Sequence, residues 1–163
     1  MDGSYGITMN YAADLRIYKQ GQVNWDDIIP GNLSLDDVDS EQTEKTTKSD
    51  DDGNYEIYVI PGKYDFYAER QGFLADITTK ITINENDEID LGNKILYEGD
   101  ADRSGIIDLN DTIEIVNSMG ASKGDSTYSE RYDFGQKGYV SLDDMVSVVG
   151  NLYKTIKIQE YTG

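Results

Sequence analysis

The chain has 163 residues, of which 37% are hydrophobic, and its 32 acidic and 14 basic residues give a net charge of −18. This length suits one domain or two small ones, and so acidic a surface repels nucleic acid and anionic membranes. No run of apolar residues is long enough to insert into a membrane, and the N-terminus lacks the pattern of a secretory signal. Because cysteine and histidine are both absent, the sequence excludes disulfides, zinc–thiolate and imidazole metal sites, and Ser-His-Asp or Cys-His catalysis.

Alternating apolar and polar residues, which are typical of β-strands, dominate the chain up to Tyr97. The alternation predicts strands within 7–11, 15–17, 55–60, 64–69 and 77–83, and we expect the last strand at 89–97. Pro61-Gly62 predicts a tight hairpin and Asp52-Gly53 a second turn, because proline fixes φ and glycine accepts a positive φ. Strands at this spacing, without helical patterns between them, indicate a small antiparallel sandwich.

An acidic segment, residues 34–52, separates the early strands from the later ones. It contains eight acidic residues, and Lys45 and Lys48 are its basic ones. Calcium binding by Asp50, Asp51 and Asp52 is one interpretation, but the ligand spacing of an EF-hand loop is missing there. We therefore interpret the segment as a solvated loop.

After Tyr97 the apolar period changes to that of helices, and a unit repeats with an offset of 33 residues. Ile113, Val116 and Met119 share one helical face with Ile115 at its flank, and Val146, Val149, Leu152 and Val148 repeat the arrangement. The same offset relates Asp100 to Asp133, Gly105 to Gly138, and Asp111 to Asp144. The sequence thus predicts a duplicated unit in which a loop precedes a helix.

The first loop, residues 100–111, has the ligand spacing of a twelve-residue EF-hand-type calcium loop. The candidate ligands are the side chains of Asp100, Asp102, Ser104, Asp108 and Asp111 and the backbone carbonyl of Ile106. Calcium takes 6–8 oxygen ligands, and glycine at position 6 permits the sharp turn around the ion. An acidic helix cap is the alternative for Asp108 and Asp111, but it does not explain Asp100, Asp102 and Gly105 at their offsets.

The second loop, residues 133–144, keeps Asp133, Gly138 and Asp144 at positions 1, 6 and 12. Position 3 is Gly135, which offers no side-chain ligand, and position 5 is Lys137, whose ammonium supplies a positive charge. We expect this loop to keep its fold while it binds calcium weakly or not at all. The sequence leaves open whether Tyr139 and Ser141 take part in a site there.

The paired loops and helices, 99–120 and 133–153, resemble a dockerin, since position 12 is Asp in both loops and no helix enters either loop. Residues 47–73, with Asp52-Gly53-Asn54-Tyr55 and Pro61-Gly62-Lys63-Tyr64, resemble the X module that precedes type II dockerins in cellulosomal scaffolding proteins. The resemblance implies two small domains: an all-β sandwich of immunoglobulin- or prealbumin-like type over residues 1–97, and an all-α dockerin with EF-hand-like motifs over residues 98–163.

The resemblance also implies a non-catalytic, calcium-dependent module that docks a cohesin domain of another protein within a cellulosome-type complex for polysaccharide degradation. The parent protein would be larger and extracellular, either secreted or held at the cell surface through a partner. Because the X module–dockerin pair normally ends such a protein, a fragment of it is expected to lack the secretory signal peptide. By resemblance, the cohesin contacts are Leu109, Asn110, Val116, Asn117, Met119, Leu142, Asp143, Val149, Gly150 and Tyr153. Val116 and Val149 have a second interpretation as core residues.

Three other functions compete with docking. A calcium sensor would need entering helices and usually has Glu at position 12. A calcium-stabilised adhesin or carbohydrate-binding sandwich would need exposed aromatic residues on one face, for which the candidates are Trp25, Tyr55, Tyr58, Tyr64 and Tyr67. A hydrolase with paired carboxylates would need acidic residues outside the two acidic loops.

Overall fold

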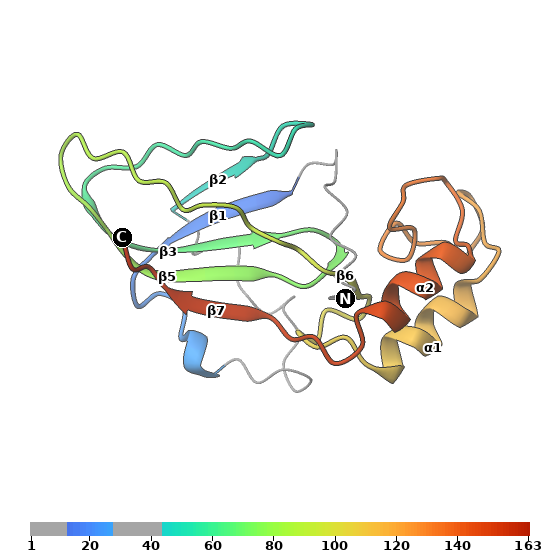
Figure 1. Ribbon diagram of the computed structural model, residues 1–163. Helices are drawn as coiled ribbons and strands as arrows, with labels where there is room; N and C mark the ends of the chain where they lie inside the picture. Colours follow the sequence, from blue (N-terminus) through green and yellow to red (C-terminus); the bar gives the residue numbers. More distant parts are fainter. Residues whose placement is uncertain (1–12, 28–43) are drawn as a thin grey trace.

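The computed structural model describes residues 13–27 and 44–163. Its elements, drawn in Figure 1, are β1 (Asp14–Lys19), η1 (Trp25–Asp27), β2 (Lys45–Lys48), β3 (Gly62–Glu69), β4 (Gly72–Phe73), β5 (Asp76–Ile83), β6 (Glu98–Asp100), α1 (Leu109–Ser118), α2 (Leu142–Gly150) and β7 (Lys157–Glu160).

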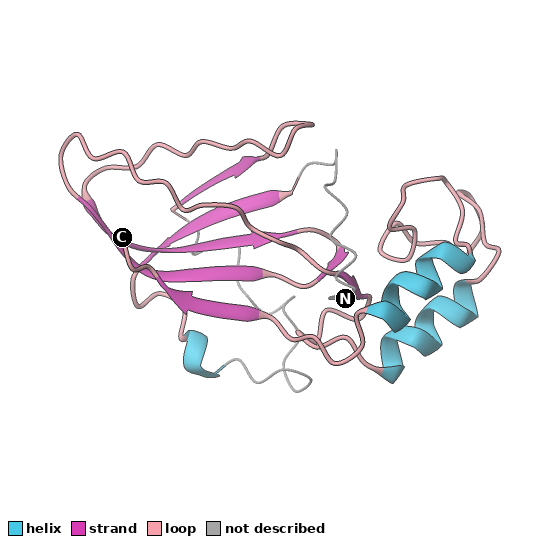
Figure 2. Cartoon of the chain, viewed as in Figure 1, coloured by secondary structure: helices cyan, strands magenta, loops and turns pink. Residues whose placement is uncertain are grey.

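The main sheet has five strands in the order β2-β1-β3-β5-β7. The first four pair antiparallel, whereas the C-terminal β7 runs parallel to β5 from Asp76↔Lys157 to Thr79↔Glu160. Both helices come between β6 and β7 in the sequence, and they lie together beyond one end of the main sheet (Figure 2). The strands β4 and β6 form a second, two-stranded sheet.

The period-2 pattern of β1 and β3 sends alternate side chains to opposite faces of the sheet. On one face, Leu15 and Ile17 lie opposite Ala68 and Phe66 and are buried under the irregular segments that contain Tyr55, Ile57, Val59, Ile89 and Leu91. On the other face, the core contains Tyr18, Trp25, Tyr67 and Ile77. This core continues into residues 101–156, which hold α1 and α2 and which we call the helical unit. The helical unit contributes Ile107, Ile115, Phe134, Val140, Val148 and Ile156 to this core.

The helical unit has an internal two-fold pattern that follows the 33-residue repeat. α1 begins at Leu109 and α2 at Leu142, and position 8 of each loop, Ile107 or Val140, is completely buried. Tyr153 donates its backbone N–H to the carbonyl of Ile107 (2.7 Å), and Gly120 donates to that of Val140 (2.9 Å). Each loop is therefore tied to the segment that follows the other helix.

The expected fold class, a β-sandwich followed by an all-α dockerin, is wrong. The protein is mostly β: its C-terminal part contains β6 and β7 beside the two short helices, and β7 extends the main sheet. The four residues of β7 carry no alternating apolar pattern, and three of them are exposed. Pairing with the edge of β5, rather than a local signal, decides that this segment is a strand.

Several expected strands and turns also differ. Residues 54–60 and 84–97 form no strand but cover one face of the sheet as irregular segments, so Pro61-Gly62 joins no hairpin. The turn at Asp52-Gly53 is confirmed, with Gly53 N–H donating to the Asp50 carbonyl at 3.0 Å. Lys45–Lys48, expected in a solvated loop, forms β2. The expected strand at 7–11 and residues 34–43 of the acidic segment lie outside the described residues.

Candidate functional site

The first acidic loop joins β6 to α1 and gathers three carboxylates. Asp100 ends β6, Asp111 lies in the first turn of α1, and with Asp102 they place one oxygen each within 4.8 Å of one another. Asp100 and Asp111 are completely buried. Gly105 at position 6 has φ +81°, which permits the chain to turn around this cluster. The cluster has the donor chemistry that a hard cation such as calcium requires.

Burial disfavours the ionised form of two carboxylates in this loop. Burial, followed by the neighbouring charge of Asp111, raises the pKa of Asp100 to about 8, and burial raises the pKa of Asp111 to about 6. Asp100 Oδ2 accepts the N–H of Gly105 at 3.2 Å, but the buried Oδ1 finds no hydrogen-bond partner among the described residues. An unpartnered buried oxygen is costly, and a bound cation would satisfy it.

The other predicted ligands of the first loop, Asp108, Ser104 and Ile106, form hydrogen bonds within the loop and to the start of α1. Asp108 caps α1: its side chain accepts the backbone N–H of Asn110 at 2.7 Å. The carboxylate of Asp111 in turn accepts the backbone N–H of Asp108 at 2.7 Å. Ser104 donates its hydroxyl to the carbonyl of Ile106 at 3.1 Å. The three clustered carboxylates do not include Asp108, whose capping role agrees with the alternative interpretation of this residue.

An interaction between the first loop and the sheet has no signal in the sequence. We call it the clamp, and it consists of Arg103, Glu69, Arg16 and Tyr67. Arg103, at position 4 of the loop, forms an ion pair with Glu69 at the end of β3, and Glu69 also pairs with Arg16 of β1 at 2.7 Å. Tyr67 donates its hydroxyl to the same carboxylate at 2.8 Å. An isolated arginine in a calcium-type loop gives no local signal of a partner 34 residues away.

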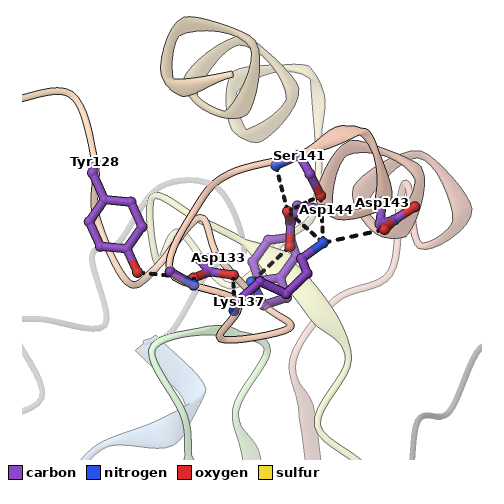
Figure 3. Close-up of polar contacts among 8 residues, drawn as sticks. Tyr128, Asp133, Lys137, Ser141, Asp143 and Asp144 are labelled. Carbon is purple, nitrogen blue, oxygen red and sulfur yellow. Dashed lines mark hydrogen bonds and ion pairs between the residues drawn. The ribbon is translucent and has the colours of Figure 1, made fainter. Parts of the chain in front are cut away.

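The second loop has the same backbone form but a different set of contacts, drawn in Figure 3. Position 4 is left-handed in both loops, at Arg103 (φ 58°) and Gln136 (φ 50°). Asp133 and Asp144 are buried, as their counterparts are, but Lys137 extends its ammonium to Ser141, Asp143 and Asp144. Burial lowers the pKa of Lys137, and the carboxylates of Asp144 and Asp143 outweigh this, so the net shift is upward.

Each helix carries an exposed apolar stripe at the spacing i, i+4, i+7. On α1 the exposed fractions are 62% for Leu109, 57% for Ile113 and 50% for Val116. On α2, Leu142, Val146 and Val149 repeat them with 67%, 56% and 50%. Val116 and Val149 therefore do not line the core, which Ile115 and Val148 fill instead. We call these six residues the helix stripes; the sequence suggested four of them as contacts and missed Ile113 and Val146.

The other expected contact residues also lie at the surface. Met119 and Tyr153, at the ends of the helices, are 39% and 73% exposed. Asn110, Asn117, Asp143 and Gly150 are exposed polar or small positions on the same helices. The two helices pack against each other, so these positions and the helix stripes belong to one pair of neighbouring helices.

Comparisons with known proteins lead to cellulosome-related proteins. The chain is 22% identical over 111 residues to Cellulosomal-scaffolding protein B of Acetivibrio thermocellus, a match that covers 65% of this chain and 14% of that protein. Its fold resembles a chain in crystal structures of two interface mutants, one C-terminal and one N-terminal, of a type II cohesin–X–dockerin complex from Acetivibrio cellulolyticus. Each likeness has a TM-score of 0.59 and 21% identity, and covers 88% of this chain and 83% of that one. No family model matches the chain.

The names of these similar proteins describe a scaffolding protein and a complex between protein modules, and none describes an enzyme. The aromatic residues considered for a carbohydrate-binding face do not form one, because Trp25, Tyr64 and Tyr67 are buried and Tyr58 is the exposed member of the set. No helix in the described parts of the chain is both long and apolar enough to cross a membrane.

Proposed function

We propose that this chain is a non-catalytic docking module of a cellulosome-type assembly, that it binds a cohesin domain through α1 and α2, and that calcium in the first loop stabilises the docking surface. The parent protein would be larger and extracellular, either secreted or held at the cell surface through its partner. The observation that carries this proposal is the pair of helix stripes.

The helix stripes support docking because they are apolar, exposed and matched. A large contiguous patch of exposed apolar side chains usually marks an interaction site. Single exposed apolar residues are common on protein surfaces and need no explanation. Here the same three positions are exposed on both helices, in a chain whose net charge is −18. The likeness to the cohesin–X–dockerin complexes supports cohesin as the class of partner.

The first loop supports calcium through its donor set. Asp100, Asp102 and Asp111 offer carboxylates, and the Ile106 carbonyl and Ser104 hydroxyl lie in the same loop. Within residues 13–27 and 44–163, one buried oxygen of Asp100 has no hydrogen-bond partner. Since β6 supplies Asp100 and α1 supplies Asp111, an ion between them would fix the start of α1 and hence its stripe. Calcium would thereby act on docking without touching the partner.

Binding to a panel of immobilised cohesin domains, in calcium and in chelator, tests the proposal. We expect binding to at least one cohesin in calcium, and a loss of at least tenfold in affinity for Val116→Asp and Val149→Asp. Ile60→Asp is the matched control, because Ile60 is 67% exposed but belongs to the segment just before β3 and to neither helix. If no cohesin binds, or if Ile60→Asp weakens binding as much as the helix variants, the docking proposal is wrong.

A further inference from the structure

The second loop satisfies its buried carboxylates entirely with protein donors. Asp133 accepts from the N–H groups of Lys137 at 2.9 Å and Gly138 at 2.7 Å, and from the Tyr128 hydroxyl at 3.0 Å. Asp144 accepts from the N–H groups of Phe134 at 3.0 Å and Ser141 at 2.8 Å. All four carboxylate oxygens thus have a hydrogen bond, in contrast to Asp100 in the first loop.

The Lys137 ammonium lies beside two of the side chains that would face a cation in this loop, those at positions 9 and 12 (Figure 3). Its Nζ donates to the Ser141 hydroxyl, lies 3.3 Å from Asp143 Oδ2 and 3.5 Å from Asp144 Oδ2, and stands 5.4 Å from the centre of the Tyr139 ring. These partners occupy loop positions 9, 11, 12 and 7. The side chain of Lys137 is 27% exposed, so its charge acts in a partly desolvated setting.

Gly135 and Lys137 form a matched pair of departures from the calcium-loop pattern. A Cβ built at Gly135 would lie 3.3 Å from Lys137 Cε and 3.6 Å from its Cδ and Cγ. The stem of Lys137 therefore lies directly beside the place where a position-3 side chain, Asp102 in the first loop, would begin. The first loop has Ser104 at the lysine position and directs its own cation, Arg103, to Glu69 of the sheet.

We propose that the Lys137 ammonium replaces a metal ion in the second loop, so that residues 133–144 hold the start of α2 without calcium while the first loop depends on it. This inference rests on the proposed calcium site only for the contrast between the loops. Its consequence is an asymmetric docking surface, in which one helix stripe responds to calcium and the other does not.

Two measurements on the intact chain test the inference. Native mass spectrometry with calcium is expected to show one ion in the wild type and two in the double variant Gly135→Asp with Lys137→Asp. Two ions in the wild type would overturn the inference. No ion in the wild type and one in the double variant would contradict the calcium site of the first loop but support the lysine-neutralised second loop.

Amide hydrogen exchange in chelator gives the second readout. We expect the amides of α2 to stay protected at least tenfold more than those of α1, and Lys137→Met to remove that difference. Lys123→Met is the control, because Lys123 has a side chain that is 75% exposed and forms a long ion pair with Glu130 at 3.8 Å. Equal loss of protection in both helices of the wild type, or an unchanged pattern in Lys137→Met, would overturn the inference.

Discussion

Replacing Glu69 by alanine tests the clamp that joins the first acidic loop to the sheet. Glu69 is almost completely buried, and the side chains of its partners Arg16 and Arg103 are only 20% and 18% exposed. Removal of one member of a buried ion pair costs about 3–5 kcal/mol, because the charge left behind stays desolvated. Because both arginine side chains are already partly exposed to water, we expect the lower end, a loss of about 3 kcal/mol in the free energy of unfolding.

This loss is large beside the 5–15 kcal/mol by which domains are typically stable. With a urea dependence of about 2 kcal/mol per molar, it corresponds to a fall of about 1.5 M in the midpoint of urea unfolding, measured at saturating calcium. Glu69→Gln should lose roughly half as much, because the amide still accepts the hydroxyl of Tyr67. Glu160→Ala is the control: its pair with Lys80 is more than half exposed and contributes about 0–1 kcal/mol. A midpoint for Glu69→Ala no lower than that of Glu160→Ala would refute the clamp.

Three further predictions concern the first acidic loop, Gly72 of β4 and the two helices. Asp100→Asn should raise the melting temperature in chelator at neutral pH and lower it in calcium. Burial raises the pKa of Asp100 to about 8, so without metal the fold must protonate a carboxylate that is ionised in the unfolded chain, and asparagine avoids this cost. Calorimetry with and without chelator should show these opposite signs. Gly72→Ala should lower the free energy of unfolding in urea by at least about 2 kcal/mol, because Gly72 has φ +82° and the added Cβ would lie 2.3 Å from the Arg131 carbonyl oxygen. Gly124→Ala is the control: its Cβ would meet no described atom within 4 Å, so only the positive φ opposes it and the cost is about 1 kcal/mol. If cohesin binds in a single orientation, Asn117→Ala should weaken the affinity measured by calorimetry about tenfold, since a lost polar contact costs about 1–3 kcal/mol. Gly150→Ala, at the equivalent position of the second repeat, should change the affinity little. Equal tolerance of both substitutions would indicate two interchangeable orientations.

Local signals in the sequence determined the helical unit and the central strands. The starts of α1 and α2, at Leu109 and Leu142, follow the 33-residue repeat, because the acidic loop and the first-turn carboxylate define a helix start from a few adjacent residues. Alternation likewise placed Phe66 and Tyr67 on opposite faces of β3, but it did not predict that both faces are buried. Such patterns need only the residue types and their spacing.

Tertiary structure alone decided which of these surfaces are covered. Each helix has two apolar edges, and the spacing does not tell whether Ile115 or Val116 meets the core. In the folded chain Ile115 is completely buried in the core shared with the sheet, whereas Val116 stays 50% exposed. The strands β2 and β7 have mostly polar or exposed residues and form because a free sheet edge offers them hydrogen bonds. The pairing of Arg103 with Glu69 spans 34 residues and requires the loop to be folded against the sheet. In each case the deciding partner is distant in sequence, so no local pattern carries the information.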